Sequence, residues 1–377
     1  MARLIVVEDL AAPSVVRRGG MAMYVLQFLN GLARLGHDVL FVEFLEEEPD
    51  AAAVGYFEAV VERWWSPDRA ALILEPGLAG RAGLGVERVR AAAADADAVI
   101  TLAAHYRREP WPLIGGVRPR ILVDQDPGYT QLWAAEGDPV DFYGEQDVHF
   151  TVGANIGTER SALPAVGIDW HHLFNPVVLD WWAGDVSLER DRFTTVGAWR
   201  DYGYLEWEGR TIGPKVEEFE HFIDLPGRTG ESFELALSID PEDPDLPRLR
   251  EHGWRVEDAA VVAAPERYRS YVRGSLGEFS CAKGGYVATR SGWFSDRSAC
   301  YLAAGRPVIV QATGFEDVLP VGAGLFAVGD VEEAAEAVRA VRSDYSHHSR
   351  AARRIAREHF DSDRLLTRML AEAGVAY

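Results

Sequence analysis

The chain lacks the features that mark a secreted or membrane-spanning protein. Only two of its 377 residues are cysteine, too few for a disulfide framework and without the spacing of metal ligands. The apolar run in MARLIVVEDL is far shorter than a membrane span or the core of a secretion signal, and it ends in Glu8 and Asp9. We therefore predict a cytoplasmic protein without a membrane span.

Positive charge is also scarce. The chain has 38 Lys and Arg residues against 59 Asp and Glu residues, which gives a net charge of -21 and an isoelectric point near 4.9. Nucleic acids are bound through clustered Lys and Arg side chains, so this balance predicts no nucleic-acid partner. We expect a small-molecule partner instead.

The chain also lacks a dinucleotide-binding motif and the spacing of metal ligands. The nearest match to the dinucleotide-binding motif G-x-G-x-x-G is GLGVER at 83–88, which lacks the third glycine and follows no clear strand, so a nicotinamide-dependent dehydrogenase is disfavoured. The pairs His171, His172 and His347, His348 are adjacent residues whose side chains point different ways, and no third ligand stands at fitting spacing. We therefore predict no metal site and no cofactor.

The residues that are present predict two α/β domains. Single hydrophobic cores stop growing near ~250 residues, and this chain is longer. The run LIVVE at 4–8 is typical of a buried parallel strand, apolar residues recur at helical spacing over 21–35, and 39–44 is again a strand. This βαβ alternation restarts at FTTVGAW, residues 193–199, so we predict two tandem doubly wound Rossmann-like domains with a cleft between them.

The boundary between the two domains is predicted from composition. The stretch 175–192 carries Pro176, Gly184 and mixed charge, as a linker does, and the sequence after Val331 is nearly all helical. We therefore place an N-terminal domain at 1–183, a C-terminal domain at 184–360, and a C-terminal helix at 361–377 that can pack back on the first domain.

The segment SGWFSDRSACYLAAGRPVIVQATGF, residues 291–315, carries the clearest chemistry. Ser295 or Asp296 can cap a short helix, and an apolar strand and a second glycine loop follow. A helix N-terminus preceded by Gly292 offers unpaired N–H groups and the positive dipole end to an anion such as a diphosphate, and Arg297 adds a fork that matches phosphate oxygens. The alternative is an ordinary helix, strand and turn of an α/β domain.

Two sequence blocks resemble one enzyme family. GWFSDRSACYLAAGRPVIV resembles the EGFGLPxxEAMAxGxPVI region of glycosyltransferases with the GT-B fold, particularly the group-one families and the spore-coat CgeB-like group. GGMAMYVLQFLNGLARLGHDVLFVEF, which begins at Gly19 and Gly20, is similar to their N-terminal glycine loop, helix and GH-x-V strand. The blocks lie at opposite ends of the chain in the order that this fold requires.

The resemblance implies an enzyme of the hexosyltransferase type that moves a sugar from a nucleoside diphosphate to an acceptor. In this family the donor lies mainly against the C-terminal domain and the acceptor against the N-terminal one. The donor-binding residues that it implies are those at the helix start and after the strand: Ser295, Asp296, Arg297, Ser298, Thr313, Gly314 and Phe315. The two glutamates of the family fall on Gly292 and Cys300, so neither is present, and Asp296 is the carboxylate that can substitute.

Two lysines are candidates for a further phosphate contact. Lys215 begins a helix in TIGPKVEEF, where the family places a basic residue, and Lys283 precedes two glycines in GEFSCAKGGY. The alternative for each is an ordinary surface lysine, with Lys215 facing Glu218.

Candidates for catalysis and for lining the cleft follow strands of the first domain. Asp124 and Asp126 end the strand ILVD, and His105 follows the strand AVITLAA, which are positions where a general base for an acceptor hydroxyl is useful. The alternatives are an Asx-type turn for the aspartates and a surface loop for the histidine. Asn155, in VGANIG, follows another strand and is a candidate to line the cleft.

Together these observations predict a metal-independent glycosyltransferase. Its expected donor is a UDP- or dTDP-sugar, and its expected acceptor is a small molecule such as a natural product of secondary metabolism. The alternatives are a sugar-nucleotide epimerase of the same fold and a catalytically silent nucleotide or sugar binder, which the absence of the two glutamates favours. The sequence carries no signal for the oligomeric state.

Overall fold

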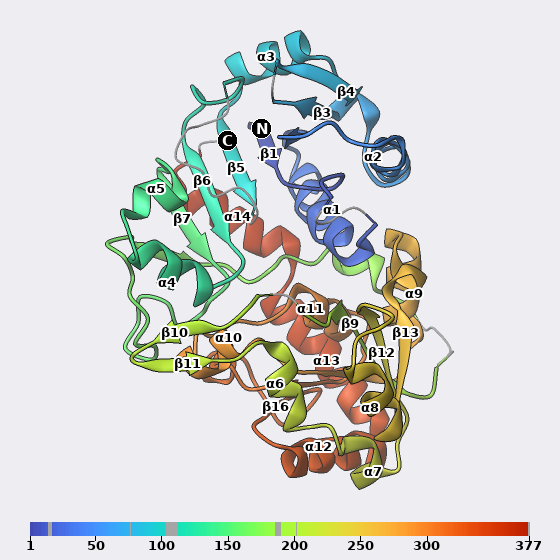
Figure 1. Cartoon of the computed structure of the whole chain (residues 1–377). Helices are drawn as coiled ribbons and strands as arrows, with labels where there is room; N and C mark the ends of the chain where they lie inside the picture. The colour runs from blue at the N-terminus through green and yellow to red at the C-terminus, as the bar shows by residue number, and fades with distance from the viewer. Residues whose placement is uncertain (14–16, 76, 103–111, 185–189, 201, 376–377) are drawn as a thin grey trace. The chain divides into compact units, whose positions relative to one another are not determined.

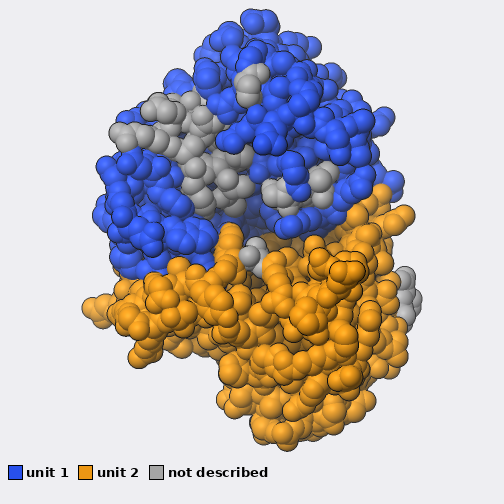
Figure 2. Space-filling model, in the orientation of Figure 1, with its two compact units in different colours: residues 1–152, 164–178, 362–377 blue, residues 153–163, 179–361 orange. Residues whose placement is uncertain are grey.

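The chain forms two compact units in the computed structural model (Figures 1 and 2). The structure describes all residues except 14–16, 76, 103–111, 185–189, 201 and 376–377. Unit 1 comprises Met1–Val152, Pro164–Val178 and Ser362–Tyr377, and unit 2 comprises Gly153–Leu163 and Leu179–Asp361. Each unit is described here by itself.

Unit 1 is built on an eight-stranded sheet with the order β4-β3-β2-β1-β5-β6-β7-β8. Neighbouring strands are parallel except β3 and β4, which form an antiparallel pair. The central strands are apolar on both faces, as expected when helices cover both sides of a parallel sheet. The strands are β1 (Arg3–Val7), β2 (Asp38–Leu45), β3 (Ala70–Leu74), β4 (Ala79–Gly83), β5 (Ala98–Leu102), β6 (Arg120–Asp124), β7 (Val148–Thr151) and β8 (Trp170–His172).

The helices of unit 1 come from both ends of the chain. They are α1 (Gly19–Arg34), α2 (Ala51–Trp64), α3 (Val86–Ala94), α4 (Tyr129–Ala135), α5 (Pro139–Tyr143) and α14 (Ser362–Glu372). In Figure 1 the red α14 lies beside the blue α1. The two helices approach closely at Gly31, where an added Cβ would lie 2.5 Å from Cδ1 of Leu366. The Ser362 N–H also donates to the Val177 carbonyl, at 3.0 Å.

A buried carboxylate fixes the loop that follows β1. Glu43, on β2, is fully buried, and its Oε1 accepts hydrogen bonds from the backbone N–H groups of Ala11 and Ala12, both at 2.8 Å. Burial and, to a smaller extent, the charge of Asp9 raise the pKa of Glu43 to about 8, although the backbone hydrogen bonds act to lower it. The protonation of Glu43 therefore affects the free energy of unfolding of unit 1.

Glu43→Gln should flatten the dependence of stability on pH. Because the pKa of Glu43 is raised in the folded state, its contribution is fully present below about pH 4.5 and is lost as pH rises through about 8. The free energy of unfolding should fall by up to about 1.4 kcal/mol per pH unit in that window, and the glutamine variant should lose this slope. Chemical denaturation between pH 4.5 and 8 measures it. The exposed Glu47→Gln is the matched control, and an unchanged slope in Glu43→Gln would contradict the assignment.

Unit 2 is built on a six-stranded sheet with the order β13-β12-β9-β14-β15-β16, in which every neighbouring pair is parallel. This is the Rossmann order 3-2-1-4-5-6, in which the strand order reverses between the first and fourth strands, here β9 and β14. The strands are β9 (Phe193–Ala198), β12 (Phe233–Ser238), β13 (Trp254–Asp258), β14 (Gly277–Ser280), β15 (Val308–Gln311) and β16 (Leu325–Val328). Ligands bind beyond the carboxyl ends of strands at such a reversal.

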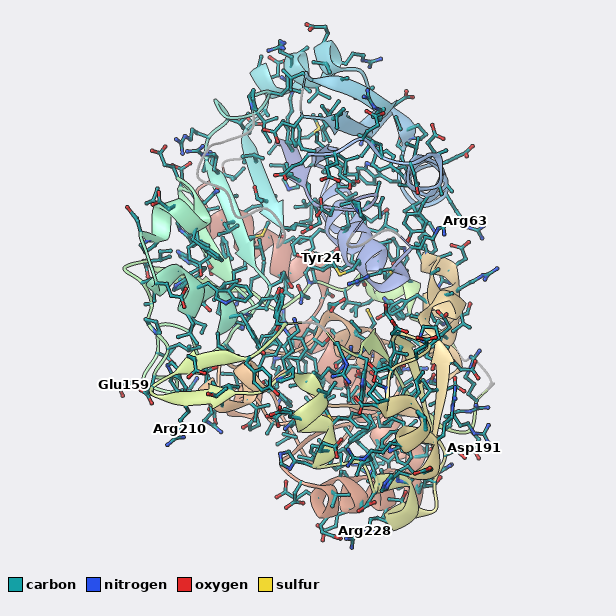
Figure 3. All side chains as sticks on the ribbon, viewed as in Figure 1. Tyr24, Arg63, Glu159, Asp191, Arg210 and Arg228 are labelled. Carbon is teal, nitrogen blue, oxygen red and sulfur yellow. The ribbon has the colours of Figure 1, made fainter. Side chains whose placement is uncertain are left out.

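Helices cover this sheet, and a small hairpin follows β9. The helices are α6 (Lys215–Glu220), α7 (Leu225–Thr229), α8 (Asp245–Glu251), α9 (Pro265–Gly274), α10 (Gly284–Thr289), α11 (Asp296–Ala303), α12 (Val331–Ser343) and α13 (Tyr345–His359), and the hairpin pairs β10 (Leu205–Trp207) with β11 (Arg210–Ile212). Aromatic rings dominate the core, with Phe233 and Trp254 5.1 Å apart. Charged side chains such as Asp191 and Arg228 lie at the surface (Figure 3).

The two largely parallel sheets with covering helices confirm the predicted α/β class and its two Rossmann-like domains. Within the part of the chain that the structure describes, no helix combines the length and the hydropathy of a membrane span.

Candidate functional site

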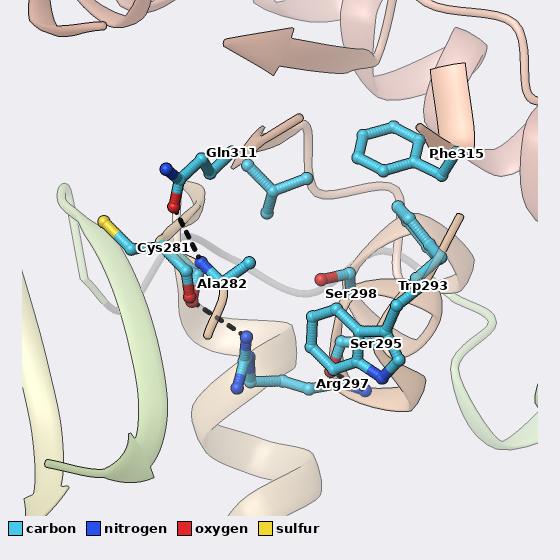
Figure 4. Close-up of a pocket in the computed structure, with 11 residues that line it drawn as sticks. Cys281, Ala282, Trp293, Ser295, Arg297, Ser298, Gln311 and Phe315 are labelled. Atoms are coloured by element: carbon cyan, nitrogen blue, oxygen red, sulfur yellow. Dashed lines mark hydrogen bonds between the residues drawn. The ribbon is translucent and has the colours of Figure 1, made fainter. Parts of the chain in front are cut away.

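A pocket opens at the carboxyl ends of β14 and β15 in unit 2, next to the point where the strand order reverses (Figure 4). Its walls come from the end of β14, the start of α11, and the end of β15 with the loop that follows. The lining residues are Ser280, Cys281, Ala282, Trp293, Phe294, Ser295, Arg297, Ser298, Val310, Gln311 and Phe315. Four of the predicted donor residues therefore lie around one pocket: Ser295, Arg297, Ser298 and Phe315.

The start of α11 is set by Ser295. Of the two predicted caps, Ser295 is the one that the structure uses, because its Oγ accepts the Arg297 N–H at 3.2 Å. Asp296 occupies the first turn, where the helix dipole favours a carboxylate. Burial raises the pKa of Asp296, and the positive charge of Arg297 acts in the opposite direction.

Arg297 is held by protein groups on all three guanidinium nitrogens. Its Nε lies 2.6 Å from Oε1 of Glu278, its Nη1 donates to the Val196 carbonyl at 2.7 Å, and its Nη2 donates to Ser280 Oγ at 2.9 Å. Burial acts to lower the pKa of Arg297, but the charge of the fully buried Glu278 outweighs it, so the pKa is raised. The structure thus shows an internal ion pair, and the phosphate contact of Arg297 stays a prediction.

Lys215 brings a second cation to the same place. It begins α6, and a Cβ built on Gly197 would lie 3.1 Å from Lys215 Nζ and 3.9 Å from Arg297 Nη1. The two positive groups therefore meet at the carboxyl end of β9. Burial raises the pKa of the neighbouring Cys281 thiol, which disfavours its thiolate form.

Lys283 lies on aromatic rings beside the pocket. Its Nζ is 3.7 Å from the centre of the Tyr202 ring and 5.5 Å from that of Tyr286. Tyr286 in turn stacks on Trp293, with ring centres 4.4 Å apart. Trp293 lines the pocket. Lys283 is therefore linked to the pocket through the stacked rings of Tyr286 and Trp293.

The loop after β15 lies against the loop that precedes α11. Thr313 Oγ1 donates to the Trp293 carbonyl at 2.6 Å, and the Thr313 carbonyl accepts the Gly292 N–H at 2.8 Å. Gly314 has a φ of +95°, a conformation that favours glycine, and Phe315 packs edge-on against Phe294. The structure therefore brings together the two predicted donor loops.

The positions of the two missing family glutamates are both buried. Gly292 has a φ of +78°, and a Cβ there would lie 2.8 Å from the backbone nitrogens of Ala154 and Asn155. Cys300 is buried. Carboxylates near the pocket include Asp296, Glu278 and Glu218, and the Gln311 amide donates to Glu218.

Sequence reasoning missed several residues of this site. Glu278 lies on an apolar strand, and nothing in the sequence indicates its ion pair with Arg297. Gln311 ends a strand just before a glycine loop, and that position could have identified it as a candidate. Composition held another signal: the chain has two lysines, Lys215 and Lys283, and both lie around this site in unit 2.

The catalytic candidates and the glycine loop belong to unit 1. Asp124 is fully buried and accepts four hydrogen bonds, from Thr130 Oγ1, Gln131 Nε2 and Thr151 Oγ1 at 2.9 Å and from the Asp126 N–H at 3.3 Å. The last bond forms the Asx-type turn that was the alternative interpretation of this motif, and the catalytic role of Asp124 stays a prediction. Asp126 is half-buried.

The other candidates of unit 1 are placed as follows. Gly19 and Gly20 form the first turn of α1. His105 lies outside the described residues. Among the residues that the structure describes, no group of three His, Cys, Asp or Glu side chains could hold a metal ion.

Solved structures share the fold of this chain. No family model matches the chain, and no curated sequence matches it, but solved structures of glycosyltransferases share its fold over nearly its whole length. Anabaena Alr3699/HepE, solved with UDP and glucose, has a TM-score of 0.59 at 12% identity, covering 100% of both chains. An alpha-glucosyltransferase solved with UDP-glucose and DNA containing an abasic site has a TM-score of 0.61 at 11% identity, covering 99% of both chains. A glycosyltransferase from Rickettsia africae ESF-5 has a TM-score of 0.53 at 11% identity, over 98% of this chain and 97% of its own.

These similarities confirm the resemblance to GT-B glycosyltransferases at the level of the fold. They also correct one expectation. The inference from net charge to the absence of a nucleic-acid partner is wrong, because one enzyme of this fold was solved on DNA. Net charge describes a whole chain, whereas phosphates are bound by a local surface.

Proposed function

We propose that the protein is a glycosyltransferase that uses a UDP-sugar as donor, which it binds in the pocket of unit 2. The observation that carries the proposal is the position of the pocket. It lies at the carboxyl ends of β14 and β15, next to the strand-order reversal of a Rossmann sheet. The start of α11 and Arg297 line it, and Lys215 lies near Arg297. The similar structures were solved with UDP or UDP-glucose, which supports uridine over the other bases.

The diphosphate is proposed to lie at the start of α11, near Ser295 and Ser298. Positive groups aimed at the leaving diphosphate lower the barrier, because charge develops there as the bond to the sugar breaks. Lys215 is the cation assigned this role. The guanidinium of Arg297, which is paired with Glu278, lies beside it. With these groups the proposed reaction needs no metal ion. The loop with Thr313, Gly314 and Phe315 is proposed to face the sugar.

Unit 1 is proposed to bind the acceptor, which we propose is a small hydroxyl compound. Asp126, half-buried at the end of β6, is the proposed general base, since Asp124 is committed to its hydrogen bonds. The same assay should include DNA duplexes as acceptors, because an enzyme of this fold was solved with them. The epimerase alternative is not favoured, because the similar structures are glycosyltransferases.

Lys215→Ala should weaken UDP binding by about 10-fold or more without unfolding unit 2, because it removes a charge worth over a kcal/mol to the diphosphate. Calorimetric titration of UDP, dTDP, GDP and ADP measures the affinity. Arg339→Ala, which removes an exposed positive charge from α12, is the matched control.

The two lysines make a second measurement possible. UDP should protect Lys215 from an amine-acylating reagent, and mass spectrometry reports each lysine separately. Absence of binding by every nucleotide would overturn the proposed function, whereas binding that Lys215→Ala leaves unchanged would overturn only the role of Lys215.

A further inference from the structure

The segment 153–163, here called the bridging segment, belongs to unit 2 although it directly follows β7 of unit 1 in the chain. Its first residues pair with the loop that precedes α11. The Ala154 N–H donates to the Gly292 carbonyl at 3.3 Å, and the Asn155 N–H donates to the Ser291 carbonyl at 3.1 Å. The bridging segment is therefore bonded to the loop that leads into α11 and the proposed donor site.

One side chain of this segment joins both donor loops. The amide of Asn155 is fully buried, and its Nδ2 donates to the Arg290 carbonyl at 3.0 Å and to the Gly314 carbonyl at 3.1 Å. Arg290 precedes the α11 loop, and Gly314 lies in the loop after β15. Both N–H groups of one amide are thus used to hold two separate loops at a fixed distance.

The orientation of this amide follows from its partners. The reversed amide would place Oδ1 against two carbonyl oxygens, which repel it, so Nδ2 must face them. Oδ1 is buried and accepts no hydrogen bond from the described residues. A buried amide oxygen without a donor is costly, and the two carbonyl bonds offset that cost.

The backbone is shaped to let Asn155 approach. Gly314 and Gly292 both have positive φ, and a Cβ on Gly314 would lie 2.5 Å from Asn155 Nδ2. The two loops are also bonded to each other through Gly292 and Thr313. Three segments distant in sequence are therefore locked together at one buried amide.

We infer that Asn155 is a positioning residue of the donor site. It sets the distance between the loop proposed to hold the diphosphate and the loop proposed to face the sugar, and this inference rests on the proposed function. Asn155 touches neither ligand; it acts through the carbonyl groups of Arg290 and Gly314. A displacement of reacting groups by about 1 Å can cost on the order of 100-fold in rate, so a loosened loop pair should be detectable.

The test compares Asn155→Asp with Ser161→Ala. Aspartate has the shape of asparagine but presents oxygens to both carbonyls, so the two loops should separate. Ser161 also belongs to the bridging segment, and its Oγ donates to the Thr289 carbonyl at 2.8 Å, just outside the donor loops. Ser161→Ala therefore removes the side-chain bond to the Thr289 carbonyl and leaves the bonds of Asn155 to the donor loops in place.

Asn155→Asp should raise the KM for the donor and the Kd for UDP by about 10-fold or more, while Ser161→Ala should change both by less than about two-fold. Thermal unfolding checks that both variants fold. Asn155→Ala, which adds no charge, should lie between wild type and Asn155→Asp. A donor KM for Asn155→Asp equal to that of Ser161→Ala would overturn the inference.

Hydrogen exchange without ligand separates this inference from the proposed function. The amides of Gly292 and Gly314 should exchange faster in Asn155→Asp than in wild type, and Ser161→Ala should leave them unchanged. If the wild type fails to bind UDP while this difference is present, the donor assignment is wrong and the coupling of the loops stands. If exchange at both loops is unchanged, the coupling itself is wrong.

Discussion

Replacing Arg297 with alanine should lower the free energy of unfolding of unit 2 by about 3–5 kcal/mol. The reason is Glu278, which is fully buried and has Arg297 at 2.6 Å. Removing the guanidinium leaves that carboxylate in the protein interior without its compensating charge, and it also leaves the Val196 carbonyl and Ser280 without a donor. Urea denaturation of the variant measures the loss.

A double variant tests the cause. Glu278→Gln combined with Arg297→Met leaves no buried charge and keeps much of the volume, so it should recover at least half of the lost stability. A single Arg297→Ala variant as stable as wild type would show that the ion pair contributes nothing. The expected result also means that lost nucleotide binding in Arg297→Ala does not by itself demonstrate a phosphate contact, so Lys215 is the better probe.

Replacing Asp124 with alanine should destabilise unit 1 by about 3 kcal/mol or more. The carboxylate accepts from two hydroxyl groups, one amide and one backbone N–H, and these buried donors would lose their acceptor together. Differential scanning calorimetry should show a drop in the melting temperature of roughly 10 °C. The result would identify Asp124 as a residue that holds β6, β7 and α4 together.

Asp126→Asn is the matched control in the same loop. It should leave the melting temperature within a few degrees and lower kcat, because Asp126 is half-buried and is the proposed base. A stable Asp124→Ala variant with lost activity would reverse the two assignments.

Local sequence signals predicted the local structure well. The cap at Ser295, the end of α11 before Gly305 and the strand that follows are all encoded within a dozen residues, where propensity and capping act directly. The same holds for β1, α1 and β2, whose apolar spacing gave the first βαβ unit. The short hairpin of β10 and β11 carries no comparable apolar pattern and was missed.

The roles of individual polar side chains were harder to predict, because their partners are distant in sequence. Asp124 follows a buried strand, as expected of a catalytic base, but its partner Thr151 comes from the next strand of the sheet, so this hydrogen bond could not be predicted from the local sequence. Arg297 stands where a phosphate ligand is expected, and only the pairing of β14 with its neighbours places Glu278 beneath it. The prediction from net charge about nucleic acid was wrong for a related reason, because a sum of charges does not say where on the surface the charges lie.

The place of α14 in unit 1 has a consequence for synthesis on the ribosome. The whole of residues 179–361 is made after the rest of unit 1 and before α14. At typical rates of elongation this interval lasts roughly 10–40 s, during which the face of α1 around Gly31 has no helix to cover it. Until α14 leaves the exit tunnel, the surface of α1 that it covers is therefore open to chaperones or to other chains.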